Sequence, residues 1–176
     1  MRRMIMTTVT GLLIGGAGVV TLALPASAAD TPVTVVVTGG DLAISAPAAS
    51  VKLGTKAGSS DAQSVTGLLG AVVVSDGRAG IAGWVATAGS TDFAGSAGGS
   101  SILASTVGYV PGTAFVVGTS TVTAVSLTAM TTPGTVQTAT AVSGVNTGTW
   151  NPSITVPLPA GALAGTYSAT ITHSVS

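Results

Sequence analysis

Cysteine and glutamate are absent from the 176 residues, and histidine occurs once. The missing thiols exclude a thiolate metal site, thiol catalysis, disulfides and a cysteine-linked lipid anchor. Lysine and arginine total five and aspartate totals five, so the formal net charge is zero. Only Lys52, Lys56 and Arg78 follow the N-terminal stretch, which is too few cations for a face that binds nucleic acid. Hydrophobic residues make up 46 % of the chain, which argues against disorder.

The N-terminal stretch has the three parts of a secretory signal. Arg2 and Arg3 precede an uncharged, apolar or small-residue stretch, residues 5–24, and Ala26-Ser27-Ala28 then supplies a small-residue cleavage site. We therefore expect a signal peptide over residues 1–28, cleavage between Ala28 and Ala29, and no stable membrane span after processing. A retained anchor is the alternative, because the apolar stretch is long enough to cross a bilayer. The paired arginines leave the twin-arginine route open beside general secretion.

The remainder, residues 29–176, has the composition of one all-β domain. Threonine and valine favour strands, and Gly or Pro marks turns at short intervals, as in Asp76-Gly77, Pro111-Gly112 and Pro133-Gly134. No window favours a helix longer than two turns. This pattern predicts a single antiparallel β-sandwich, Ig-like or of Greek-key type, with about eight to ten strands. The predicted strands are 33–38, 42–44, 51–53, 68–74, 84–90, 101–110, 119–128, 137–143, 150–158 and 167–175.

The last two predicted strands alternate strictly between apolar and Thr or Ser side chains. This alternation is typical of an antiparallel sheet with one face in water. The stretch 68–74 is instead apolar at both parities and predicts a central strand covered on both faces. One apolar set is Trp150, Pro152, Ile154, Val156 and Leu158, and the other is Tyr167, Ala169, Ile171, His173 and Val175.

Residues able to carry catalysis are scarce and scattered. His173 lies on an apolar face, which favours a core or edge histidine with satisfied nitrogens over a member of a catalytic triad. The five aspartates fall in predicted turns or near the N-terminus, where Asp commonly bonds the local backbone. A calcium loop needs several oxygen ligands close together, and Asp76-Gly77-Arg78 supplies one carboxylate beside an arginine that would repel the ion. We therefore expect no enzyme activity, no metal and no cofactor. A secreted hydrolase with paired carboxylates is the least favoured function.

Six aromatic residues follow the predicted signal peptide, and each large ring has two interpretations. A ring either fills a core otherwise built from Val, Ala and Leu or stands exposed as a stacking platform for a sugar. For Trp84 and Trp150 the core interpretation is favoured. The candidate binding residues are nevertheless Trp84, Asp92, Phe93, Trp150, Tyr167 and His173.

Three stretches resemble the WxL-domain cell-surface proteins of Gram-positive bacteria. Residues 83–88, followed by Thr91-Asp92-Phe93, are similar to the first Trp-x-Leu strand of the family and its downstream Asp-Phe. Residues 148–156 supply the second stretch, and residues 164–175 resemble the closing strand that normally carries a second Trp-x-Leu. The chain departs from the family at Ala86, where the family has Leu, and at His173-Ser174-Val175, which replaces Trp and Leu.

The resemblance implies display on the cell surface and non-covalent attachment to peptidoglycan or to surface protein partners. A self-assembling structural or adhesive subunit, which adds strands to exposed edges, is the alternative. The Thr- and Ser-rich, charge-poor surface is compatible with either function, and equally with genome composition alone.

Overall fold

The computed structural model describes residues 31–96, 98 and 101–176. The chain divides into two units, Met1–Val35 and Val36–Ser176, and every strand lies in the second. The predicted signal peptide and the cleavage site between Ala28 and Ala29 lie outside the described residues.

The second unit is all-β, as the sequence predicts. In the described part of the chain the helical content is one three-residue 3₁₀ helix, η1 (Ala104–Thr106). The strands are β1 (Leu42–Ser45), β2 (Gln63–Leu68), β3 (Val72–Asp76), β4 (Trp84–Ser90), β5 (Ala94–Gly95), β6 (Gly108–Val110), β7 (Phe115–Ala124), β8 (Gly134–Trp150), β9 (Ser153–Leu158), β10 (Tyr167–Ser168) and β11 (Ile171–Val175).

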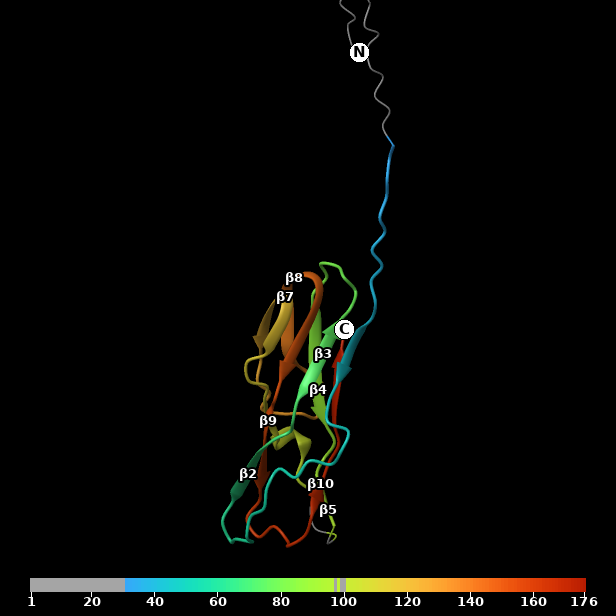
Figure 1. Cartoon of the computed structure of the whole chain (residues 1–176). Helices are drawn as coiled ribbons and strands as arrows, with labels where there is room; N and C mark the ends of the chain where they lie inside the picture. The colour runs from blue at the N-terminus through green and yellow to red at the C-terminus, as the bar shows by residue number, and fades with distance from the viewer. Residues whose placement is uncertain (1–30, 97, 99–100) are drawn as a thin grey trace, which may run out of the picture. The chain divides into compact units, whose positions relative to one another are not determined.

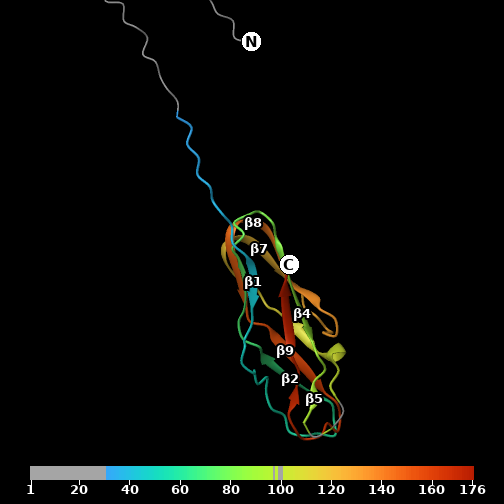
Figure 2. The same cartoon turned by 90° about the vertical axis from the view of Figure 1, so that its right-hand side faces the viewer.

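These strands form three sheets, and all the strand pairings described are antiparallel. The largest sheet has the order β1-β3-β8-β4-β11, and β7 also pairs with β8. A three-stranded sheet has the order β2-β9-β6, and β5 pairs with β10. Figures 1 and 2 both place β7 and β8 at one end of the unit and β2, β5 and β10 toward the other.

The β7–β8 hairpin bends the largest sheet. The first part of β8 pairs with β4, where Trp84 opposes Ala139, and its last part pairs with β3, where Val74 opposes Gly148. β7 follows β8 through the bend, with register shifts on both sides of Thr119. Because β1 also lies beside β11, the sheet nearly closes into a barrel.

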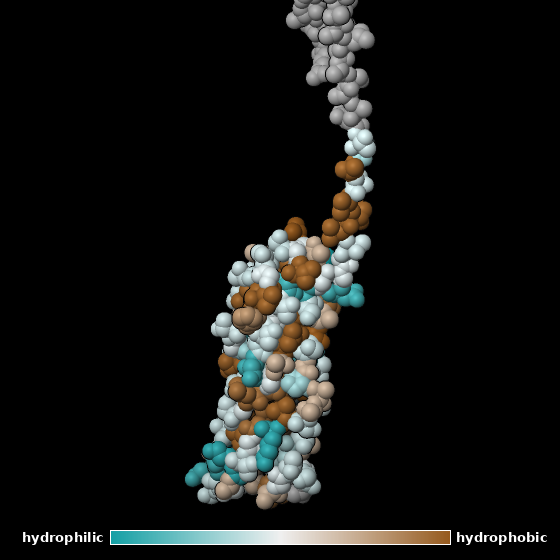
Figure 3. Space-filling model, in the orientation of Figure 1, coloured by the Kyte–Doolittle hydropathy of each residue, from teal (hydrophilic) through white to brown (hydrophobic). Residues whose placement is uncertain are grey.

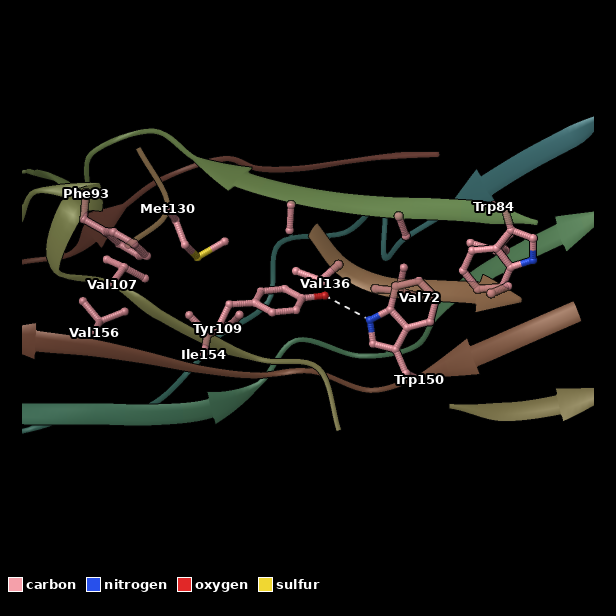
Figure 4. Packing of buried hydrophobic residues seen from close by; sticks show 14 of the residues in the cluster. Val72, Trp84, Phe93, Val107, Tyr109, Met130, Val136, Trp150, Ile154 and Val156 are labelled. Carbon is pink, nitrogen blue, oxygen red and sulfur yellow. Dashed lines mark hydrogen bonds between the residues drawn. The ribbon is translucent and has the colours of Figure 1, made fainter. Parts of the chain in front are cut away.

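The core extends along the unit from Trp84, through Trp150 and Tyr109, to Phe93 (Figure 4). Both larger sheets contribute to it, because Trp150 belongs to β8 whereas Tyr109 belongs to β6. Burial of these rings removes a large apolar area from water, which is the main favourable term in a fold without disulfides.

Two predicted strands are broken at the same level of the fold. The apolar stretch 68–74 leaves β2 and enters β3 through Gly70, whose φ of +103° interrupts the strand. The predicted strand 150–158 likewise divides at Asn151-Pro152 into β8 and β9. Asn151 Oδ1 accepts from the Gly70 N–H at 2.9 Å, and the Leu69 N–H donates to the Pro152 carbonyl at 2.9 Å. These two hydrogen bonds hold together the two places where the chain passes from one sheet to the other.

Other strand predictions need correction. Residues 33–38 are not a strand, and no described strand pairs with them. Residues 51–53 are also outside any strand, and the stretch 101–110 yields only η1 and β6. The apolar parity of residues 167–175 is confirmed, since its apolar set is half-buried and its Thr and Ser set is exposed.

Substitution at the hairpin bend tests its geometry. Gly118 has a φ of +86°, and a Cβ there would lie 2.5 Å from the Val145 carbonyl oxygen. We expect Gly118→Ala to lower the free energy of unfolding by about 3 kcal/mol, because left-handed strain adds to a backbone clash. The matched control is Gly144→Ala on the facing strand, where φ is +73° and a Cβ meets nothing within 4 Å. The control should lose about 1 kcal/mol in urea titrations. Equal losses would contradict the close approach.

Candidate functional site

Three of the six candidate binding residues are buried in the core. Trp84, at the start of β4, and Trp150, at the end of β8, have almost no exposed surface. Phe93 is buried as well and forms an antiparallel bridge with Ile102. For the two tryptophans the structure therefore shows the core alternative, and none of the three rings offers a face to a ligand.

The ring nitrogen of Trp84 takes part in a buried polar network that the local sequence does not indicate. Its Nε1–H donates to Asn146 Oδ1 at 3.1 Å, and Asn146 Nδ2 donates to Asp76 Oδ2 at 3.2 Å. Asp76 and Asn146 are both buried and oppose each other in the β3–β8 pairing. Their closeness depends on a pairing across 70 residues, for which the local sequence holds no signal.

Arg78 neutralises Asp76. The Arg78 Nε and Nη2 atoms lie 2.8 and 2.9 Å from the two carboxylate oxygens, and Nη2 also donates to the carbonyls of Ala82 and Gly83. The hydrogen bonds from Arg78 lower the pKa of Asp76 from 3.8 to about 2, against the opposing effect of burial. A carboxylate held in this way stabilises the turn after β3 and is poorly suited to general acid–base work.

A second buried chain of hydrogen bonds joins Trp150, Tyr109 and His173. Trp150 Nε1 donates to the Tyr109 hydroxyl at 3.0 Å (Figure 4), and that hydroxyl lies 3.0 Å from His173 Nε2. Because indole nitrogen only donates, the tyrosine oxygen accepts from it. The tautomer of His173 sets which of the hydroxyl and Nε2 donates in the second bond. The other ring nitrogen, Nδ1, is buried without a partner.

Burial has opposite effects on the two titrating groups of this chain. It raises the pKa of Tyr109 to about 12, while the bond from Trp150 opposes the shift. It lowers the pKa of His173 from 6.5. Within the described residues no carboxylate is hydrogen bonded to His173. The expectation that both its nitrogens are satisfied is corrected, because only Nε2 has a partner.

Asp92 and Phe93 hold in place the segment around η1 by hydrogen bonds to its backbone. The Asp92 Oδ1 atom accepts from the Ala104 N–H at 2.7 Å, and the bridge from Phe93 to Ile102 closes the loop beside it. Asp92 is exposed, and one of its two carboxylate oxygens is used by this bond to the backbone.

Tyr167 is the candidate residue that reaches a concave surface. It is half-buried, and its ring rests on Gly95 of the paired strand, where a Cβ would lie 3.0 Å from the ring. Its hydroxyl donates to the Leu163 carbonyl at 3.1 Å. Tyr167 lines a hollow of about 370 Å³, which we call the Tyr167 hollow, together with residues 159–163. None of its lining side chains is charged. A neighbouring hollow of about 280 Å³ is lined mainly by apolar residues such as Ile102, Leu103 and Leu158.

The six candidates therefore do not form one site. Asp92, Phe93 and Tyr167 lie at or beside the β5–β10 pair, Trp150 and His173 meet through Tyr109, and Trp84 belongs to the Asp76 network. Among the described residues no group of three or more His or Asp side chains is placed to hold a metal ion. In the part of the chain that the structure describes, no helix is long and apolar enough to cross a membrane.

Comparison with known proteins finds no matching family model, no matching curated protein and no matching solved structure.

The buried histidine predicts a pH dependence of stability. Because the pKa of His173 is lowered in the fold, the unfolded chain binds more protons below pH 6.5, and folding is disfavoured there. We expect the free energy of unfolding to fall as pH drops from 7 towards 5, by at most about 1.4 kcal/mol per pH unit. In His173→Gln this slope should disappear, whereas the loss that Asp76 causes between pH 3.8 and about 2 should remain. Urea titrations at each pH measure both; an unchanged slope in His173→Gln would contradict the assignment.

Proposed function

We propose that this protein is a secreted cell-surface protein that binds the bacterial cell wall non-covalently, through the Tyr167 hollow. The observation that carries the proposal is the Tyr167 ring, half-buried on Gly95 and lining an uncharged hollow of about 370 Å³. This volume lies within the range of small-ligand sites. An aromatic side with backbone polar groups around it suits a glycan, because the apolar face of a sugar ring stacks on the aromatic ring while its hydroxyls take hydrogen bonds.

The resemblance to WxL-domain proteins is part of the proposal. Its first and third stretches lie in β4 and β11, which pair with each other so that Ala88 opposes His173 and Ala86 opposes Val175. The two regions that resemble Trp-x-Leu strands are thus neighbours in one sheet. Because Trp84 is buried there, we assign wall contact to Tyr167 and a structural role to these strands.

The finer fold assignment also belongs to the proposal. We infer an Ig-like or Greek-key β-sandwich in which the six-stranded and three-stranded sheets are the two layers. This inference is supported by the single core to which β3, β4 and β8 contribute on one side and β6 and β9 on the other. Export by way of residues 1–28 is proposed with it.

Co-sedimentation of residues 29–176 with protein-free peptidoglycan sacculi tests the function. We expect saturable pelleting of the natural chain, and we expect Tyr167→Ala to weaken it about tenfold, which corresponds to roughly 1.4 kcal/mol of lost ring contact. Tyr167→Phe keeps the ring and should retain most of the binding. The matched control is Phe115→Ala, which removes an exposed ring from β7, a strand that pairs with neither β5 nor β10.

The outcomes separate direct wall binding from its alternatives. Natural protein that stays in the supernatant would contradict wall binding altogether. Equal binding by all variants, with unfolding curves that show each to be folded, would keep wall binding but remove it from the Tyr167 hollow.

A further inference from the structure

The segment Val33–Val37 has the sequence of a strand but belongs to no described sheet. Val33, Val35, Val36 and Val37 are 82–90 % exposed, and no described strand pairs with them. Residues 31–40 carry no charge, and after Pro32 each residue up to Thr38 is β-branched. Such residues favour extended backbone, and exposed apolar runs of this kind mark interaction sites. On the face of the domain drawn in Figure 3, strongly hydrophilic residues are few.

Strand β7 has a free edge that matches this segment. β7 pairs with β8 along one side only, and no described strand covers the other. Its ten residues include no charge and no proline, which are the usual devices that protect an edge. Phe115 is 71 % exposed and Val117 is 58 % exposed, and they oppose Thr149 and Thr147 on the outer face of the sheet.

We propose that residues 33–37 of one copy add as a strand to the β7 edge of a second copy. In this arrangement Val33, Val35 and Val37 extend the outer row that contains Phe115 and Val117, because alternate residues of a strand share one face. The backbone groups of both strands, which lack partners in the described domain, then pair with each other. Addition of an extended segment to a sheet edge is an established mode of recognition.

The short stretch of chain between β1 and residues 33–37 favours pairing with the β7 edge of a second copy over pairing with β7 of the same molecule. Gly40 and Asp41 are tied to Gly77 by hydrogen bonds of 2.6 and 2.8 Å, at the β1 end of the sheet order. Val37 is three residues from Gly40 and so reaches at most about 11 Å from it. Within one sheet β7 lies three strand spacings from β1, or roughly 14 Å. A strand that begins at Val37 therefore finds this edge on another molecule.

Each copy carries one donor segment and one acceptor edge. Association then proceeds head to tail, or stops at a dimer where two copies exchange segments reciprocally. Wall binding at Tyr167 uses neither surface, because β10 and β7 lie at opposite ends of the unit (Figures 1 and 2). Either proposal can therefore fail without the other.

Sedimentation velocity of residues 29–176 between about 1 and 100 µM, a range that brackets ordinary association, tests the proposal. We expect concentration-dependent assembly of the natural chain. Val36→Pro removes a backbone donor from the segment, and Val117→Lys places a charge on the edge, so each variant alone should stay monomeric. Thr55→Lys, on an exposed stretch outside any strand, is the charge control and should assemble as the natural chain does.

A mixing experiment identifies the donor and the acceptor. Val36→Pro retains a working edge and Val117→Lys retains a working segment, so an equimolar mixture should form 1:1 dimers that do not grow further. Matching unfolding curves exclude misfolding of either variant. Assembly of Val36→Pro by itself would overturn the proposal in favour of pairing between two β7 edges. A natural chain that remains monomeric throughout the concentration range would overturn strand addition of any kind.

Discussion

The hydrogen bond from Trp150 to Tyr109 joins the two larger sheets at the centre of the core. Trp150 ends β8 of the six-stranded sheet, and Tyr109 lies in β6 of the three-stranded sheet. A buried indole N–H needs an acceptor, and the hydroxyl that accepts it also lies 3.0 Å from His173 Nε2 on β11. One requirement for satisfied polar groups thus sets the relative position of three strands. With no cysteine and few charges, the fold depends on this core and on the ladders around it.

The second constraint is the passage of strands from one sheet to the other. β2 continues into β3 and β8 continues into β9 at adjacent points, where Asn151 and Gly70 are hydrogen bonded. Proline at position 152 lacks the N–H that a continuous ladder uses, so the strand ends there and restarts in the other sheet. The parity of the side chains survives the break, because Trp150, Pro152 and Ile154 are all buried. Residues of one sequence pattern therefore line one core that two sheets share.

The polar side chains of the interior are used in holding the fold together. Asp76 is held by Arg78 and Asn146, and His173 is bonded to Tyr109. The surface features that the proposals use are an uncharged hollow beside Tyr167, the unpaired segment 33–37 and the edge of β7. Recognition at such places relies on shape, ring contact and backbone pairing. The Tyr167 hollow and the β7 edge lie toward opposite ends of the unit.

Local sequence alone determined the all-β class, most turn positions and the apolar parity of residues 150–158 and 167–175. These features depend on strand propensity, on Gly and Pro, and on the two-residue period of a strand, all of which are local. The tertiary structure decided that residues 68–74 divide between two sheets, that residues 33–38 remain unpaired, and that His173 is bonded on one nitrogen only. It also brought Asp76 to Asn146 and Trp150 to Tyr109. Each of these outcomes depends on a partner tens of residues away, and a strand's own residues do not specify which distant strand will lie beside it.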